Sequence, residues 1–277
     1  MSEARRETSR TGVQLATREW MPSGKPRAGI LIIHGLAEHS GRYEHVGEQL
    51  AGRGFAVQAF DQRGHGESQG DRVHIDAWDI YLDDVEDRLS ALKFEVAAPL
   101  VMYGHSFGGL VALDYCLSRS EVLPDLLVLS APAVAASIAK WKQVLAPILA
   151  KVVPKASLPL DLEGHQLSRD EAVGKAYFDD PLVETKATAK FGAETLAAQK
   201  RVGARMDSLS IRTMVIAGGS DEIVPATSSH GLGEVLGVDR TLYPNLRHEV
   251  HNEPEGPEVV GDIADWIDAQ LARGERA

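Results

Sequence analysis

Residues 99–113 read PLVMYGHSFGGLVAL and place a serine between an apolar strand pattern and a helix pattern. Gly104 and Gly108 flank Ser106 at positions where a side chain would collide with the backbone of a tight strand-to-helix turn. A serine hydroxyl that protrudes from such a turn lies beside backbone N–H groups and can attack an ester. The stretch therefore predicts a nucleophile elbow with Ser106 as the nucleophile.

Strand and helix patterns alternate along most of the chain. Residues 5–9 and 13–20 are typical of a hairpin, and apolar runs predict strands at 29–33, 55–60, 100–103, 126–130, 213–217 and 241–243. Between them, helical periodicity predicts helices at 43–53, 78–94, 108–119, 228–236 and 258–272. This alternation predicts an α/β fold with a doubly wound, mostly parallel sheet.

One interval, residues 131–210, contains no convincing strand, although a parallel crossover needs only about a dozen residues. We therefore expect a hydrolase-type core made of residues 1–130 and 211–277, with residues 131–210 inserted as a helical cap. The interval carries an apolar stripe at helical spacing that Pro147 is expected to split or kink. The stripe consists of Trp141, Val144, Leu145, Ile148, Leu149, Val152 and Val153.

Four lysines accompany this stripe, namely Lys140, Lys142, Lys151 and Lys155, and no acidic residue lies between Asp125 and Asp161. One interpretation is a lid whose outer side contacts an anionic lipid surface. The alternative is an ordinary helix that buries its stripe on the body and leaves its lysines solvated.

Composition limits the other classes of function. The chain has 277 residues, and 29 Lys and Arg against 40 Asp and Glu give a net charge of −11, which disfavours nucleic-acid binding. Cys116 is the only cysteine, so one chain can form neither a disulfide nor a thiolate zinc site. Residues 1–20 lack the apolar segment of a signal peptide, and no later run reaches membrane-spanning length. We expect a cytoplasmic protein, with any membrane contact peripheral.

A serine nucleophile needs a base, and the base needs an orienting acid. In α/β-hydrolases the chain order is serine, acid, histidine. Asp221 follows the strand pattern at 213–217, and His248 follows the one at 241–243, so both are expected at the edge of the sheet that carries Ser106. His251 is an alternative base. Asp239 is an alternative acid, although it precedes a strand pattern instead of ending one.

The oxyanion formed by the attack needs two N–H donors. The first is expected from the backbone of Phe107, which follows the nucleophile, and the second from the loop after the strand at 29–33. In that loop Gly35 allows a turn, and the backbone N–H of Leu36 is the predicted donor.

These motifs together resemble the monoacylglycerol lipase family of the α/β-hydrolase superfamily. The matching stretches read HGLAEHSGRY at 34–43, DQRGHGES at 61–68, GHSFGG at 104–109 and GSD at 219–221, within a likeness that runs from about residue 12 to 272. The resemblance implies hydrolysis of monoacylglycerol to glycerol and fatty acid, without metal or cofactor, beneath a helical cap. It places the triad on Ser106, Asp221 and His248 and the oxyanion donors on Leu36 and Phe107.

The same resemblance assigns the glycerol head group to Glu38, Arg42 and His251. The alternative for the first two is that they pair with each other and hold the loop. Ala37 stands where many relatives have glycine, and the interval 131–210 is the least family-like in pattern.

The sequence also bears on three other functions. A broader carboxylesterase or lysophospholipase would use the same triad, and a binding protein without activity would not need one. A peptidase of the proline iminopeptidase type is disfavoured because no glycine-proline-glycine loop follows His34 and Gly35. The sequence gives no indication of the oligomeric state.

Overall fold

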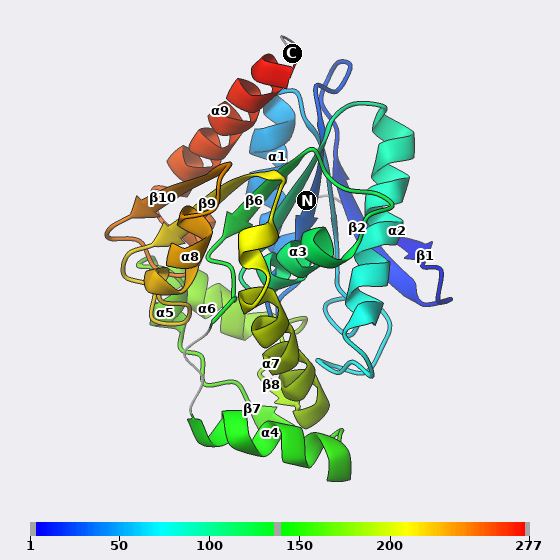
Figure 1. Cartoon of the computed structure of the whole chain (residues 1–277), viewed down its shortest axis with the longest axis vertical. Helices are drawn as coiled ribbons and strands as arrows, with labels where there is room; N and C mark the ends of the chain where they lie inside the picture. Colours follow the sequence, from blue (N-terminus) through cyan, green and yellow to red (C-terminus); the bar gives the residue numbers. More distant parts are fainter. Residues whose placement is uncertain (1–3, 136–139, 275–277) are drawn as a thin grey trace.

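The computed structural model describes residues 4–135 and 140–274 and has an eight-stranded sheet at its centre (Figure 1). The strands are β1 (Arg5–Thr8), β2 (Gln14–Trp20), β3 (Gly29–Ile33), β4 (Ala56–Phe60), β5 (Leu100–His105), β6 (Leu126–Ser130), β9 (Arg212–Gly218) and β10 (Val238–Tyr243). Their order across the sheet is β1-β2-β4-β3-β5-β6-β9-β10. The β1–β2 and β2–β4 pairs are antiparallel and the others are parallel. The predicted hairpin and mostly parallel sheet are therefore confirmed.

Helices cover both faces of the sheet, which explains why its inner strands are apolar on both sides. In β3, Ile30 and Ile32 belong to the apolar cluster that contains residues of α1 (Glu44–Gly52) and α9 (Gly256–Gly274). Leu31 and Ile33 belong to the opposite cluster, with residues of α2 (Asp79–Val96) and α3 (Phe107–Ser118). All five residues of β3 are buried. The core thus lies in two layers, one on each side of the sheet.

The chain differs from the predicted pattern between β9 and β10. The helix expected at 228–236 is a 3-10 turn, η3 (Ala226–Ser229), followed by a single short helix, α8 (His230–Gly233). Glycines at 231, 233 and 237 weaken the helix propensity there. Gly237, between α8 and β10, has a φ of 90°, which is outside the helical region. Strand β10 begins earlier than predicted, so Asp239 lies within the strand.

Between β6 and β9 the chain forms an inserted segment beyond the carboxyl ends of the central strands (Figure 1). It contains α4 (Lys140–Val152), β7 (Ser157–Pro159), α5 (Gly164–Leu167), α6 (Glu171–Asp179), β8 (Lys186–Thr188) and α7 (Ala189–Gly203), followed by η2 (Met206–Ser208). The expectation that this interval holds no strand is wrong, because β7 and β8 pair antiparallel. Each has three residues, too few for an alternating pattern to be recognised.

Helix α4 continues through Pro147, so the proline does not split it. Most of its apolar stripe faces outward, with exposed Trp141, Val144, Ile148 and Val152, while Ala146 is buried. The side chains of Lys140 and Lys142 lie outside the described residues. No helix within the described ranges is long and apolar enough to cross a membrane.

Candidate active site

Ser106 lies on the turn between β5 and α3, with φ 52° and ψ −117°. This conformation is strained for a residue with a side chain and is held by the surrounding backbone. The Ser106 N–H donates to Ser130 O at 2.8 Å, and Ser106 O accepts from Ala133 N at 2.9 Å. A Cβ on Gly108 would lie 2.1 Å from Ile33 O, so the helix can approach β3 only with glycine there. The turn therefore has the geometry of the predicted elbow.

Asp221 and His248 follow β9 and β10, and their side chains meet Ser106. His248 Nε2 lies 2.8 Å from Ser106 Oγ, and His248 Nδ1 lies 2.7 Å from Asp221 Oδ2. The other oxygen, Asp221 Oδ1, accepts from the backbone N–H groups of Ile223 and Val224, both at 2.8 Å. Because Oδ1 is committed to the backbone, Oδ2 faces the imidazole in a fixed direction.

The charge of the acid acts directly on the histidine. Burial opposes protonation of His248, but the carboxylates of Asp221, Glu249 and Glu38 together outweigh it, Asp221 most strongly, and raise the pKa of His248 above its ordinary value. Two neighbouring histidines behave in the opposite way, because burial lowers the pKa of His105 well below the ordinary range and that of His251 to about 3. Of these three histidines in the described part of the chain, His248 alone combines a hydrogen bond to Ser106 with an adjacent carboxylate that favours its imidazolium.

The alternative residues lie elsewhere. Asp239 accepts from Arg212 at 2.9 Å and from Trp266 Nε1 at 2.8 Å, so it holds α9 against the sheet. The ring of His251 is buried, stacks on Tyr43 with centroids 5.0 Å apart, and has no hydrogen-bond partner on either nitrogen among the described residues. Neither residue is bonded to the serine or to His248.

Leu36 and Phe107, the predicted oxyanion donors, both line the cavity that contains Ser106. Phe107 is the first residue of α3, so its N–H has no acceptor within the helix. Leu36 follows Gly35, whose N–H donates to Glu38 Oε1 at 2.6 Å. Glu38 therefore fixes the loop that carries Leu36, the second predicted donor.

The cavity above the serine has a volume of about 230 Å³ and mostly apolar walls. The inserted segment contributes Leu158, Leu160, Leu162, Leu167, Phe191 and Leu196 to these walls. We call the part of the lining outside the inserted segment the floor, and it includes the polar residues Ser106, His248, Glu38 and Glu249. The inserted segment adds Asp161, Thr188, Thr195 and Gln199. A mostly apolar cavity with a few polar groups beside the serine suits an ester with a hydrocarbon chain.

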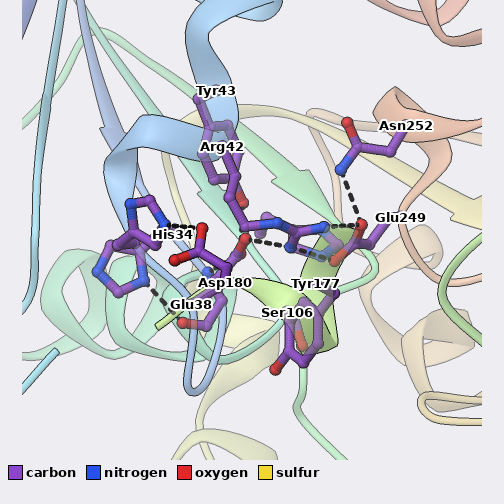
Figure 2. Close-up of polar contacts among 12 residues, drawn as sticks. His34, Glu38, Arg42, Tyr43, Ser106, Tyr177, Asp180, Glu249 and Asn252 are labelled. Atoms are coloured by element: carbon purple, nitrogen blue, oxygen red, sulfur yellow. Dashed lines mark hydrogen bonds and ion pairs between the residues drawn. The ribbon is translucent and has the colours of Figure 1, made fainter. Parts of the chain in front are cut away.

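The predicted head-group residues separate in the structure. Glu38 lines the cavity, whereas Arg42 and His251 do not belong to its lining within the described residues. Arg42 Nη1 donates to Glu38 Oε2 at 2.7 Å, so the two residues do pair. Arg42 also donates to both carboxylate oxygens of Glu249, at 2.6 and 2.7 Å (Figure 2).

Glu249 and Tyr177 were not predicted, although both line the cavity. The Tyr177 ring covers the Arg42 guanidinium at 4.8 Å (Figure 2). The only sequence signal for Glu249 is its position directly after His248. No spacing rule connects it to an arginine 207 residues away, and Tyr177 comes from the inserted segment, where the pattern was least informative.

Backbone hydrogen bonds tie the inserted segment to both reactive loops. Glu249 N donates to Leu167 O at 2.8 Å, and Glu184 N donates to Ala37 O at 2.9 Å. Side chains add to this link, because His39 Nε2 lies 2.9 Å from Asp180 Oδ2. The segment therefore braces the loops of the candidate base and of the oxyanion donor.

A parallel sheet with helices on both faces, and a serine on a strand-to-helix turn at its carboxyl edge beside a histidine and an aspartate, define an α/β-hydrolase. The family model described as serine aminopeptidase, S33, matches residues 24–255. The chain belongs to this family of serine hydrolases.

Two relatives and one solved structure show what the chain is similar to. The chain is 32% identical to the monoacylglycerol lipase of Mycolicibacterium smegmatis, over 94% of this chain and 95% of the relative. It is 34% identical over 93% of its length to an uncharacterized abhydrolase domain-containing protein of Dictyostelium discoideum, of which it spans 28%. The crystal structure of Paleococcus ferrophilus monoacylglycerol lipase superposes with a TM-score of 0.83 at 29% identity, covering 91% of this chain and 97% of that one. The protein is thus a carboxylic ester hydrolase that acts on a small ester.

Proposed function

We propose that the protein hydrolyses monoacylglycerols to glycerol and fatty acid through an acyl-enzyme on Ser106. The observation that carries the proposal is the continuous hydrogen-bonded series Asp221, His248, Ser106 at the floor of an apolar cavity. The similarity to monoacylglycerol lipases over most of the chain supports this substrate.

The reaction follows from the order of the three side chains, with His248 between Ser106 and Asp221. His248 Nε2 accepts the Ser106 proton while Oγ bonds to the carbonyl carbon, and the negative charge on the carbonyl oxygen is stabilised by the N–H groups of Leu36 and Phe107. His248 then gives the proton to the glycerol oxygen, which leaves. A water attacks the acyl-enzyme with the same base, returning the proton to Ser106 and releasing the fatty acid.

We further propose that Glu38 meets the glycerol hydroxyls, because it lies on the cavity floor near Ser106. Arg42, which donates to Glu38, would act through it, and His251 would act through Tyr43, on which it stacks and whose hydroxyl donates to Glu38. If Glu38→Gln leaves the ratio of rates on monoacylglycerol and on a simple ester unchanged, this head-group role is wrong.

Two experiments test the proposed activity. Ser106→Ala should abolish hydrolysis and labelling by a fluorophosphonate, and retention of either would contradict the role of Ser106. A panel with matched acyl chains then separates the candidate substrates: monoacylglycerol, triacylglycerol, lysophospholipid and a short p-nitrophenyl ester. A preference for monoacylglycerol supports the proposal, whereas equal rates on all monoacyl esters would favour a broader carboxylesterase or lysophospholipase.

We also propose that residues 131–210 form a cap whose α4 side contacts an anionic lipid surface. The exposed fractions of Val144, Ile148 and Val152 are 68%, 55% and 74%, an apolar face that the body does not cover. Lys151 is exposed beside it, whereas Lys155 is paired with Asp71 at 2.5 Å. Apolar side chains next to cations are typical of helices that lie on anionic membranes.

Sedimentation with anionic vesicles tests the contact. The double variant Ile148→Ser, Val152→Ser should bind the vesicles more weakly than the wild type. Leu236→Ser is the matched control, because Leu236 is 97% exposed on another part of the surface. Equal sedimentation of the double variant, the control and the wild type would exclude this contact.

A further inference from the structure

Protein carboxylates accept from three of the five N–H groups of the Arg42 guanidinium, and a tyrosine ring covers one face. Arg42 Nη1 donates to Glu38 and to Glu249, its Nη2 donates to Glu249, and its face is covered by the Tyr177 ring. The side chains of Arg42, Glu38 and Glu249 are 11%, 2% and 3% exposed. A planar guanidinium held in this bidentate way has few directions left for a substrate. The role of Arg42 therefore lies in the two carboxylates that it connects, Glu38 and Glu249.

The connection runs between the two loops that the reaction uses. Glu249 is the neighbour of His248 in the chain, and Arg42 links it to Glu38. Glu38 Oε1 in turn accepts from Gly35 N at 2.6 Å and from the Tyr43 hydroxyl at 2.8 Å. Gly35 precedes Leu36, the proposed oxyanion donor. A single series of charge-assisted hydrogen bonds thus joins the oxyanion loop to the base loop (Figure 2).

Further hydrogen bonds fix the Glu249 end of the series. Asn252 Nδ2 donates to Glu249 Oε2 at 2.7 Å, and Glu249 N donates to Leu167 O at 2.8 Å. Burial opposes the charge of Glu249, but Arg42 outweighs it and lowers the pKa of that carboxyl to about 2. Glu249 is therefore ionised wherever the enzyme works, and the pair keeps its charges.

We propose that Glu249 and Arg42 are positioning residues of the ester hydrolase: their buried ion pair sets the distance between the His248 imidazole and the oxyanion donor at Leu36. The inference rests on the proposed function only as far as Ser106 and His248 cleave esters. It does not depend on the glycerol head group. Small displacements matter here, since a misplacement of about 1 Å can cost about a hundredfold in rate.

The assay uses a short p-nitrophenyl ester, whose cleavage needs the triad but no glycerol contact. Glu249→Gln keeps the shape and removes the charge, and Arg42→Lys keeps the charge and loses the bidentate geometry. We expect each to lower kcat about tenfold to a hundredfold with KM changed by less than about threefold. Glu258→Gln, on the exposed surface of α9, is the matched control and should behave as the wild type.

Two readouts separate positioning from a general structural role. The Glu249 charge favours the His248 imidazolium, so Glu249→Gln should move the acid limb of the rate profile to lower pH. The other ionisable groups beside His248 are Asp221, Glu38, His105 and His251. Loss of the Glu249 charge also lowers the pKa of Glu38 and of His251, so Glu38 becomes a better anion and His251 stays neutral. Also, Arg42→Met with Glu249→Met should be no slower than the worse single variant, because residues that act as one unit are not additive. This pair leaves the buried Glu38 carboxylate without Arg42. The triple variant that adds Glu38→Gln leaves no buried unpaired charge in the series, and it keeps the test valid if a single variant or the pair fails to fold.

The results that would overturn the positioning role differ from the result that would overturn the proposed function. A kcat of Glu249→Gln within threefold of the wild type, with the acid limb unmoved, would overturn the inference. So would a loss confined to KM, additive losses in the double variant, or wild-type kcat in the Met pair. If the wild type itself fails to cleave the p-nitrophenyl ester, the proposed function is what fails.

Discussion

Replacing Asp221 with asparagine isolates the contribution of one negative charge to the reaction. Oδ1 of Asp221 accepts two backbone N–H groups, and Oδ2 faces His248 Nδ1 at 2.7 Å. In Asp221→Asn the amide oxygen must keep the backbone bonds, so the amide NH₂ faces Nδ1. His248 then accepts at Nδ1 and carries its hydrogen on Nε2, where it cannot take the proton of Ser106.

The magnitude follows from the charge that is lost. For charge centres about 4 Å apart in an effective dielectric of about 20, the carboxylate stabilises the imidazolium by about 4 kcal/mol. At about 1.4 kcal/mol per tenfold, kcat should fall about a thousandfold, and the wrong tautomer extends this toward about ten-thousandfold.

Steady-state hydrolysis of a p-nitrophenyl ester across pH measures both effects. A general base must be neutral, so a raised His248 pKa means that wild-type activity is lost as pH falls, with a midpoint above about 6.5. In Asp221→Asn the midpoint should move to lower pH. Asp239→Asn is the control and should retain wild-type rates. If Asp221→Asn keeps more than about a tenth of the wild-type kcat, or Asp239→Asn loses as much as Asp221→Asn, the assignment is refuted.

Three further substitutions test the fold around the site. Gly108→Ala puts a Cβ 2.1 Å from a carbonyl oxygen of β3 and should cost about 3 kcal/mol or more in urea unfolding, whereas Gly52→Ala, which meets open space, should cost nothing. Ala37 has a φ of 65°, so Ala37→Gly should stabilise by about 0.5 kcal/mol; a lower Tm than wild type would contradict this. Arg63→Ala leaves the buried Asp84 carboxylate without its partner and should cost about 3–5 kcal/mol, and a chemical denaturation midpoint equal to that of the wild type would show that the pair contributes nothing.

The fold could be predicted because its determining residues act locally. Buried strands such as β3 are apolar on both faces, and the elbow needs small residues where α3 crosses β3, so both leave a pattern in the sequence. The same holds for Asp221 and His248, whose positions after strands bring them to one edge of the sheet. Chain order and strand ends were enough to select them over Asp239 and His251.

What could not be predicted depends on contacts between distant segments. The pairing of Arg42 with Glu249 joins loops 207 residues apart, and no periodicity marks it. The resemblance named Arg42 as a head-group residue, whereas its guanidinium contacts Glu38, Glu249 and Tyr177 and does not belong to the described cavity lining. The strands β7 and β8 are too short for a pattern, and the outward orientation of the α4 stripe is decided by how α4 packs on α7.

The bonds between the inserted segment and the reactive loops include main-chain joints, such as Glu249 N to Leu167 O and Glu184 N to Ala37 O. A backbone hydrogen bond does not depend on the side chain of either residue, except that proline cannot be the donor. The walls of the acyl cavity can therefore be rebuilt by substitution while these anchors stay in place. The side chains that line the cavity can therefore change during evolution or by design, and with them the preferred ester, while the loops that carry His248 and Leu36 stay in position.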